Sequence, residues 1–286
     1  MNSMKGKRIV ITGPTSGIGK EIAVQLAGLG AELILACRDI KKGKQTVAEI
    51  TKRTGSKKLV VMKVDTSSQK SIREFVREFR RRYRRLDVLV NNAAGNRGTL
   101  PKIDSVDGIE LTFATNVLGY FLLTNELLDV LKKSAPARIV NVASEYASDL
   151  DLDDLQFKSR KFESFRAYAQ SKACDRMLTW AFARRLDGSG VTANTMTPGL
   201  ITETGLYRNA EPELITRLTQ YSGGRTSAQG ADTAVWLASS PEMEGVSGKF
   251  FVERVEHACE FRNKKNEEKL WSICEGLVNN PSPNET

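Results

Sequence analysis

The sequence predicts a single α/β domain in which helices cover both faces of a parallel sheet. Two observations support this prediction. Short apolar runs alternate with helical patterns almost to the end of the chain, and these runs are continuous, as in strands buried on both faces. The length of 286 residues suits one such domain, and no linker rich in Gly, Ser or Pro divides the sequence.

The expected elements follow in regular order. Strands are predicted at Arg8–Thr12, Glu32–Cys37, Leu59–Lys63, Val88–Asn91, Arg138–Val142, Thr192–Thr195 and Phe250–Val252. Helices are predicted near 18–29, 41–53, 68–83, 107–133, 166–187 and 226–239. Because crossovers between parallel strands are right-handed, we expect a doubly wound, seven-stranded parallel sheet in the order 3-2-1-4-5-6-7. The domain is expected over 1–278, with a disordered tail at 279–286.

Two segments interrupt this rhythm, near 147–164 and 200–224. They follow the fifth and sixth predicted strands. Ligands of open parallel sheets bind beyond the carboxyl ends of the strands, so both segments are predicted to be substrate loops. Apolar residues in them could line a lipophilic pocket: Leu150, Leu152, Leu155, Leu200, Ile201 and Leu206.

The net charge of +9 comes largely from the run Arg80–Arg85 and from Lys52–Lys58. A nucleic-acid or membrane patch is one interpretation. The other is the solvated end of an amphipathic helix, Ser68–Tyr83, and we favour it because no nucleic-acid-binding motif accompanies the charge. No nucleic-acid partner is therefore expected.

The scattered cysteines Cys37, Cys174, Cys259 and Cys274 form no CxxC pair, which predicts reduced thiols and no metal site. No apolar run is long enough for a transmembrane segment, and the polar start of the chain does not read as a signal peptide. We therefore expect a cytoplasmic protein. His257, the only histidine, lies past the last predicted strand and is given no role.

A glycine-rich stretch, TGPTSGIG, joins the first predicted strand to the first helix. Gly13 permits a tight turn, Gly17 lets a pyrophosphate approach the backbone, and Gly19 lets helix and strand pack closely. The helix N-terminus adds free N–H groups and the positive end of its dipole. A purely structural turn is the alternative. The context favours a Rossmann-type dinucleotide site, with Thr15, Ser16 and Ile18 as further contacts.

The end of the second strand predicts which dinucleotide is bound. An acidic residue there would bind the ribose 2′-hydroxyl of NAD, whereas a basic residue would bind the 2′-phosphate of NADP. Cys37 holds the acidic position and Arg38 follows, which favours NADP(H). Asp39 is the rival ribose ligand, and a surface pair between Arg38 and Asp39 is a further alternative.

The pentad YAQSK at 168–172 predicts catalysis. Residues four apart share a helix face, so Lys172 can lie beside the Tyr168 hydroxyl. A phenol has a pKa of about 10, and a nearby ammonium would favour the phenolate. Tyr168 could then exchange a proton with an alcohol or carbonyl oxygen. Ser144 ends the fifth strand, where it could bind that oxygen, and Asn116 could hold a relay water near Lys172.

These motifs, including the GxxxGxG spacing of Gly13, Gly17 and Gly19, resemble the classical short-chain dehydrogenase/reductase family. The resemblance implies a catalytic set of Asn116, Ser144, Tyr168 and Lys172. It implies cofactor contacts, besides the glycine turn, from Arg38, Asp65, Thr66, Asn92, Ala93, Tyr168, Lys172, Pro198, Gly199, Ile201 and Thr202. The family often places Thr where this chain has Glu203, so Thr202 or Thr204 is expected to replace it.

Within that family the chain is most similar to the retinol dehydrogenase group. The similarity lies in the ACRD strand end at 36–39, the DDL triplet at 153–155, ARRL at 183–186 and GADTA at 230–234. Protochlorophyllide reductases share the Ala-Cys-Arg strand end and are a minor alternative.

The resemblance implies an NADP(H)-dependent oxidoreductase that moves a hydride between the nicotinamide and a lipophilic carbonyl or alcohol. The alternative is a catalytically silent scaffold or sensor of the same fold. In many relatives the helices that hold Asn116 and Tyr168 pair subunits, so a homodimer or homotetramer is expected.

Overall fold

The computed structural model describes residues 3–202, 205–207, 209–220 and 223–279. In these residues one sheet has the order β3-β2-β1-β4-β5-β6-β7-β8. Its strands are β1 (Arg8–Thr12), β2 (Glu32–Cys37), β3 (Leu59–Lys63), β4 (Val88–Asn91), β5 (Ala137–Val142), β6 (Val191–Thr197), β7 (Phe250–Val252) and β8 (Val255–His257). Strands β1 to β7 are parallel in the predicted order, which is thereby confirmed.

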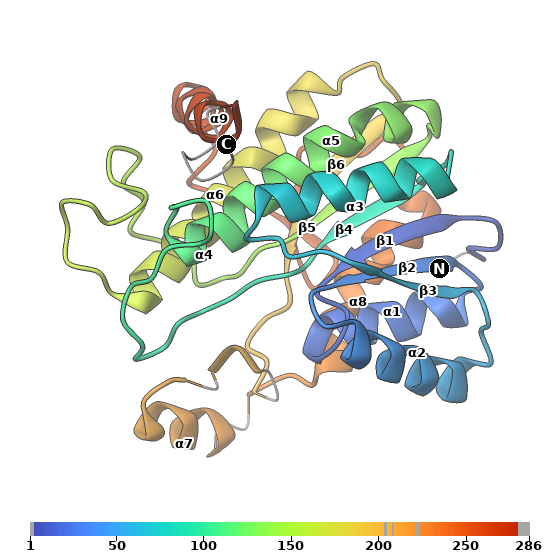
Figure 1. The fold of residues 1–286 in the computed structure, drawn as a ribbon, viewed down its shortest axis with the longest axis horizontal. Helices are drawn as coiled ribbons and strands as arrows, with labels where there is room; N and C mark the ends of the chain where they lie inside the picture. The colour runs from blue at the N-terminus through green and yellow to red at the C-terminus, as the bar shows by residue number, and fades with distance from the viewer. Residues whose placement is uncertain (1–2, 203–204, 208, 221–222, 280–286) are drawn as a thin grey trace.

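Helices cover both faces of the sheet (Figure 1). They are α1 (Gly17–Gly28), α2 (Ile40–Thr54), α3 (Gln69–Arg82), α4 (Leu111–Phe113), α5 (Gly119–Lys133), α6 (Ser164–Arg185), α7 (Pro212–Gln220), α8 (Ser227–Ser239) and α9 (Lys264–Asn279). Helices α1, α2 and α8 lie on one face, and α3, α5 and α6 lie on the other. None of the described helices is long and apolar enough to cross a membrane.

The core lies in two layers, one on each side of the sheet. One layer joins the sheet to α3, α5, α6 and α9, and the other joins it to α1 and α8. Helix α3 is amphipathic, as predicted, and buries an apolar face: Ile72, Phe75, Val76 and Phe79. Burial of these apolar side chains is the main force that attaches the helix to the sheet.

The arginine run at the end of α3 is extensively ion-paired. Arg81 and Arg82 both bind Glu78 within the helix, and Arg80 pairs with Asp129 at 2.8 Å. Arg85 binds the buried Asp87 just before β4. These carboxylates neutralise most of the local positive charge, as expected of a solvated helix end.

The predicted helix 107–133 begins later and is not uniform. The Glu110 carboxylate accepts hydrogen bonds from the N–H groups of Thr112 and Phe113, so α4 begins at Leu111. A π-helical turn, Ala114–Leu118, then separates α4 from α5. Such turns are often found at functional sites, and this one contains Asn116.

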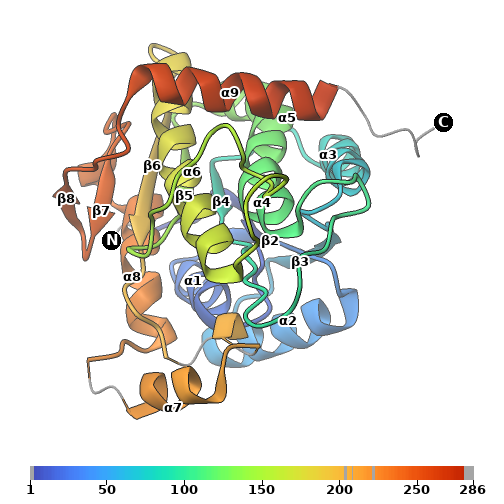
Figure 2. The ribbon, with the colours of Figure 1, turned by 90° about the vertical axis from the view of Figure 1, so that its left-hand side faces the viewer.

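The sequence prediction missed the end of the fold. Strand β8 is antiparallel to β7 and adds an eighth strand, so His257 lies inside a strand and not past the last one. Helix α9 was not predicted either, and it lies across α5 and α6 (Figure 2). The Trp271 ring lies 4.9 Å from the rings of Phe121 and Phe182, which anchors α9 to both helices.

The predicted disordered tail begins one residue too early, because α9 extends to Asn279. The remaining residues of that prediction, 280–286, lie outside the described residues, as do Glu203 and Thr204. Helix α7 was also not predicted; it lies within the segment near 200–224.

Candidate active site

The glycine turn lies where β1 ends and α1 begins. Gly13 has a φ of +65°, and a Cβ on it would lie 2.9 Å from the Cα of Ala93. A Cβ on Gly19 would lie 2.3 Å from the Asn92 amide nitrogen and from the Gly13 carbonyl oxygen. Only glycine fits at either position, so the turn packs directly against the end of β4.

The first turn of α1 has the features of an anion site. Its N-cap residue, Ser16, makes no side-chain capping hydrogen bond, unlike Asp39 of α2 and Ser68 of α3. The first N–H groups of α1 therefore remain available, with Thr15 and Ile18 partly exposed beside them. Free N–H groups at a helix N-terminus fit the phosphates of a dinucleotide.

Asn92 supports this turn from beneath. Its side-chain amide donates to the carbonyl oxygens of Thr12 (2.9 Å) and Gly13 (3.1 Å). The Thr12 hydroxyl oxygen in turn accepts from the N–H groups of Asn92 and Ala93. Because these bonds occupy its amide, Asn92 holds the shape of the turn, and its predicted cofactor contact remains a prediction.

The end of β2 presents the predicted selectivity residues in different ways. Arg38 is exposed, whereas Cys37 is buried against Gly43. Burial and the nearby Asp39 raise the pKa of the Cys37 thiol. The Asp39 carboxylate accepts from the Lys42 N–H at 3.0 Å and caps α2. In the described structure Arg38 forms no ion pair with Asp39 or with any other acidic residue.

Asp65 and Thr66 follow β3 at the same edge of the sheet. The Asp65 carboxylate accepts from both the N–H and the hydroxyl of Ser67. Thr66 is buried, and its carbonyl oxygen would lie 2.4 Å from a Cβ on Gly119. Both residues therefore shape the turn, and their predicted contact with an adenine stays a prediction.

The segment after β6 is joined to the segment before α8. Arg225 donates its N–H to the Leu200 carbonyl oxygen at 2.8 Å, and Gly199 has a φ of +74°. The Ile201 side chain is buried against Gly230, since a Cβ added to Gly230 would lie 2.5 Å from Ile201 Cδ1. Ile201 thus packs beneath α8, while Thr202 remains partly exposed.

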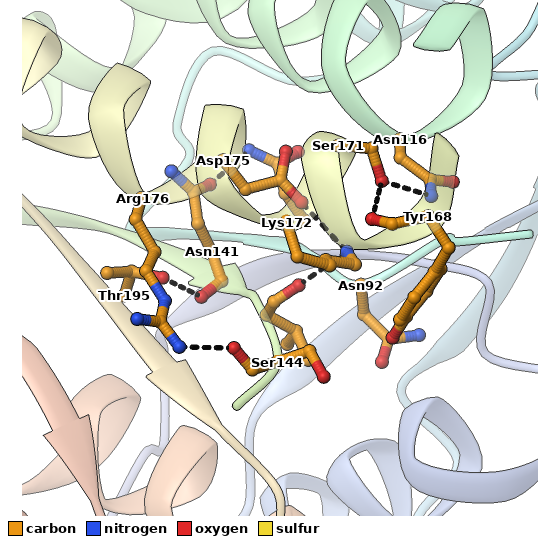
Figure 3. Close-up of polar contacts among 12 residues, drawn as sticks. Asn92, Asn116, Asn141, Ser144, Tyr168, Ser171, Lys172, Asp175, Arg176 and Thr195 are labelled. Carbon is orange, nitrogen blue, oxygen red and sulfur yellow. Dashed lines mark hydrogen bonds and ion pairs between the residues drawn. The ribbon is translucent and has the colours of Figure 1, made fainter. Parts of the chain in front are cut away.

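Tyr168 and Ser144 come together at the carboxyl edge of the sheet (Figure 3). Helix α6 supplies Tyr168, and Ser144 follows β5. Burial raises the pKa of Tyr168 to about 12, the Ser144 side chain lowers it, and Asp175 raises it again. At neutral pH the phenol is therefore protonated, with its hydroxyl able to donate to a substrate oxygen.

Lys172 has two buried hydrogen-bond acceptors of its own. Its ammonium donates to the Val142 carbonyl oxygen at 3.0 Å and to the Asp175 carboxylate at 2.8 Å. It lies 5.9 Å from the centre of the Tyr168 ring. Asp175 pairs with this ammonium, and the expectation that Lys172 lowers the pKa of Tyr168 stays a prediction.

Asn116 joins three parts of the site. Its side-chain oxygen accepts from the Gly95 N–H at 2.8 Å, and its amide donates to the Gly95 carbonyl oxygen and to the Ser171 hydroxyl. The Ser171 hydroxyl donates to the Tyr168 carbonyl oxygen at 2.7 Å. Asn116 therefore fixes the π-helical turn to α6, and its side chain faces Ser171 and not Lys172.

The predicted loop near 147–164 is attached to α6. The Gln170 side-chain oxygen accepts from the Asp151 N–H and from Arg160, while its amide donates to the Leu155 carbonyl oxygen. The Asp154 carboxylate accepts N–H groups from a tight turn formed by Lys158, Ser159 and Arg160. Gln170 thus fixes the loop to α6 two residues after Tyr168.

The sequence did not single out several residues that surround the site. They are Tyr120, Gln170, Asp175, Arg176 and Tyr207. Burial and the neighbouring Tyr168 raise the pKa of Tyr207 to about 12, which puts this phenol close to the candidate catalytic one. Asp175 could have been found, because it stands three residues after Lys172 on one helix. The others depend on contacts between distant segments.

The loop after β4 contacts two other segments near the site, which the sequence did not indicate. The N–H of Thr99 donates to the Asn209 carbonyl oxygen at 2.7 Å, and the Ser164 hydroxyl donates to the Asn96 side chain. The loop also exposes Leu100 and Ile103. It therefore connects the start of α6 with the segment before α7.

Comparison with known proteins agrees with this architecture. The family model described as short chain dehydrogenase matches residues 7–214. The chain is 37% identical to human retinol dehydrogenase 14, with 96% of this chain and 87% of the relative covered. It is 40% identical to mouse retinol dehydrogenase 12, with 95% of this chain and 86% of the relative covered.

Solved structures show the same likeness. An uncharacterised protein from Mycobacterium paratuberculosis gives a TM-score of 0.76 at 28% identity, over 99% of this chain and 97% of that one. The RhlG/NADP active-site complex of Pseudomonas aeruginosa gives a TM-score of 0.70 at 26% identity, over 87% of this chain and 95% of that one. The chain belongs to the short-chain dehydrogenase family of oxidoreductases, which use nicotinamide cofactors, and it is similar to the retinol dehydrogenases within it.

Proposed function

We propose that this protein is an NADP(H)-dependent oxidoreductase that acts on a lipophilic carbonyl or alcohol. One observation carries the proposal: the buried Tyr168 phenol and the Ser144 side chain meet at the carboxyl edge of the sheet. The uncapped N-terminus of α1 lies at this same edge. A proton donor and a phosphate site thus face one region, as hydride transfer to a carbonyl requires.

Each residue has a role that follows from its chemistry. When bound, the nicotinamide supplies the hydride to a carbonyl carbon or accepts it from an alcohol. Ser144 donates a hydrogen bond to the substrate oxygen, and Tyr168 gives that oxygen its proton during reduction. The first turn of α1 binds the pyrophosphate. Asn116 holds α6 in place through Ser171.

The choice of NADP(H) rests on Arg38. Its exposed guanidinium has no acidic partner among the described residues and follows the strand end where the ribose is expected. Asp39 is less suited to the ribose because it caps α2. The solved relative named above is a complex with NADP, which accords with this choice.

The substrate class rests on the walls of the site and on the relatives. Leu100, Ile103 and Tyr146 are large and exposed on the loops after β4 and β5. Exposed apolar side chains on loops at the carboxyl edge of the sheet suit a substrate with a long apolar body and one carbonyl group. The relatives are named after retinol, an alcohol with a long apolar body, which accords with this substrate class.

Turnover tests this proposal directly. The purified protein is mixed with NADPH or NADH and a panel of aldehydes and ketones of increasing apolar length, retinal included. We expect NADPH loss with the long members and little with the short ones. A protein that binds NADPH but turns over no member of the panel, in either direction, would instead be the catalytically silent alternative.

A further inference from the structure

Helix α9 forms an outer layer over α5 and α6 (Figure 2). Its inner side is apolar and buried, and consists of Leu270, Trp271, Cys274 and Val278. The Trp271 ring packs against the rings of Phe121 on α5 and Phe182 on α6. The Arg185 guanidinium carbon lies 3.8 Å from the centre of the same Trp271 ring. Because these contacts remove apolar surface from water, the outer side of α5 and α6 is covered by the chain itself.

Helix α9 is fixed at both of its ends. Near its start, Arg184 of α6 forms an ion pair with Glu267, a carboxylate that is 1% exposed. At its end, the Arg73 guanidinium of α3 donates to the Val278 carbonyl oxygen at 2.7 Å. The carbonyl groups of the last helical turn have no partner within the helix, so this bond satisfies one of them. Helix α9 is therefore part of the packed fold over its whole length.

The outer side of α9 is polar. Its exposed residues are Lys264, Lys265, Asn266, Lys269, Ser272, Glu275, Gly276 and Asn279. None of the large apolar side chains that the described residues expose belongs to this helix. Interfaces between stable subunits have an apolar, closely packed centre. A second copy of the chain that approached α5 and α6 would instead meet a hydrated and charged helix.

We propose that α9 fills, from within the chain, the helical face through which two copies would otherwise pair, so that no second copy binds over α5 and α6. The resemblance of the sequence led us to expect pairing through these two helices. The aromatic surface that such pairing would bury is already buried against Trp271, and the surface that α9 presents in its place is polar. The inference goes beyond the proposed function, because it concerns association and not the reaction.

The same helix supports one side of the candidate site. Lys269 of α9 forms an ion pair with Asp153 in the loop near 147–164, which leads to α6 and Tyr168. Leu150 and Leu152 of that loop pack against the core layer that contains the buried residues of α9. The loop therefore receives these contacts from its own chain, and a partner subunit is not needed to complete this side of the site.

Sedimentation of the full chain tests the proposal, together with one variant that changes only the outer side of α9. Ser272→Arg and Gly276→Arg together place two long cations there; both positions are exposed, and a Cβ on Gly276 would meet nothing within 4 Å. We expect a monomer of 31.7 kDa in the wild type, and a monomer with the same unfolding curve in the double variant. An oligomer that persists in the double variant uses another face and also supports the proposal. An oligomer that the double variant dissociates overturns it.

Hydrogen exchange tests the same point without a substitution, and it decides the matter if the double variant does not fold. Because the partners of α9 lie in its own chain, its amides should be equally protected in dilute and in concentrated protein. Protection of α9 that rises with protein concentration, while that of the sheet stays constant, overturns the proposal. Neither test measures turnover, so a protein that turns over no carbonyl or alcohol contradicts the proposed function and leaves this inference to its own two tests.

Discussion

The guanidinium of Arg176 donates a hydrogen bond to the backbone carbonyl oxygen of Ser144 (Figure 3). Arg176 is buried, with its guanidinium carbon 4.0 Å from the centre of the Phe250 ring and one nitrogen 3.6 Å from the Cys259 sulfur. No carboxylate pairs with it among the described residues. Arg176, on α6, thus fixes the backbone of Ser144, the proposed substrate-binding residue after β5.

Replacing Arg176 with Leu should therefore impair catalysis and stability together. The half-buried Ser144 carbonyl oxygen would lose its hydrogen-bond partner, which costs at most about 1–3 kcal/mol. Turnover should fall further than NADPH affinity, because the α1 turn is unaffected. Urea unfolding and single-turnover rates measure the two effects. Arg185→Leu, which removes an arginine 3.8 Å from the Trp271 ring, is the control; equal losses of turnover in both variants would contradict a specific role for Arg176.

Removing the Tyr168 hydroxyl with Tyr168→Phe should lower kcat by a factor of about 10² to 10⁴, the range typical of a lost acid–base group. NADPH affinity should stay nearly constant, since the phosphates are held by α1. Steady-state kinetics and a fluorescence titration with NADPH measure these quantities. Tyr83, the C-cap residue of α3, supplies the control Tyr83→Phe. Normal kcat in the Tyr168→Phe variant would remove Tyr168 from the mechanism.

Arg38→Ala should abolish most of the preference for NADPH over NADH. A hydrogen bond between charged partners at this position is expected to give about a 10- to 150-fold preference. Because Arg38 is exposed, the preference of the wild type should also shrink at high salt. The ratio of kcat/KM for the two cofactors measures it. Asp39→Ala is the comparison: if the wild type prefers NADH and this change removes the preference, Asp39 is the ribose ligand.

Acid should loosen the loop that contains Asp154. Burial opposes ionisation of this carboxyl, but hydrogen bonds from Lys158, Arg160 and Ser159 outweigh it and hold the pKa of Asp154 below its ordinary value of 3.8. A lowered pKa contributes stability that is fully present above that ordinary value and is lost as the pH falls through the lowered one. Hydrogen exchange at residues 158–160 should therefore be slow near neutral pH, and Asp154→Asn should accelerate it there.

The segment near 200–224 serves as an internal comparison for the hydrogen-exchange measurement at residues 158–160. Among the described residues of this second predicted loop, no buried carboxylate accepts hydrogen bonds from several N–H groups. The loop contacts the loop after β4 through the Asn209 carbonyl oxygen, which accepts hydrogen bonds from Thr99. We expect it to exchange faster than both the sheet and residues 158–160. Equal protection of the two loops would show that Asp154 does not govern the first one.

The sequence predicted those parts of the fold that local patterns encode. The seven parallel strands and their order follow from continuous apolar runs, glycine turns and the handedness of crossovers. The last part of the chain was harder to predict from local patterns. Leu270, Trp271 and Cys274 do follow a helical spacing, but Trp271 is buried only because α5 and α6 present Phe121 and Phe182 to it.

The candidate site also has a part that the sequence predicted and a part that it did not. Tyr168, Lys172 and Ser144 could be named from spacing and from strand ends, and the structure brings Tyr168 and Ser144 together. The direction of the Lys172 ammonium could not be predicted, because it depends on how deeply Asp175 is buried. A helical wheel shows that two residues share a face, but it does not show with which buried group the Lys172 ammonium forms an ion pair.

Helix α9 also has a consequence for how the protein is made. Synthesis delivers the chain from its N-terminus, so every catalytic motif leaves the ribosome before the helix that packs on α5 and α6. Until Trp271 arrives, the parts of Phe121 and Phe182 that it covers lack their partner on the nascent chain. We therefore expect a message cut short before Lys264 to encode all the candidate catalytic side chains and still give a product that chaperones retain and proteases remove.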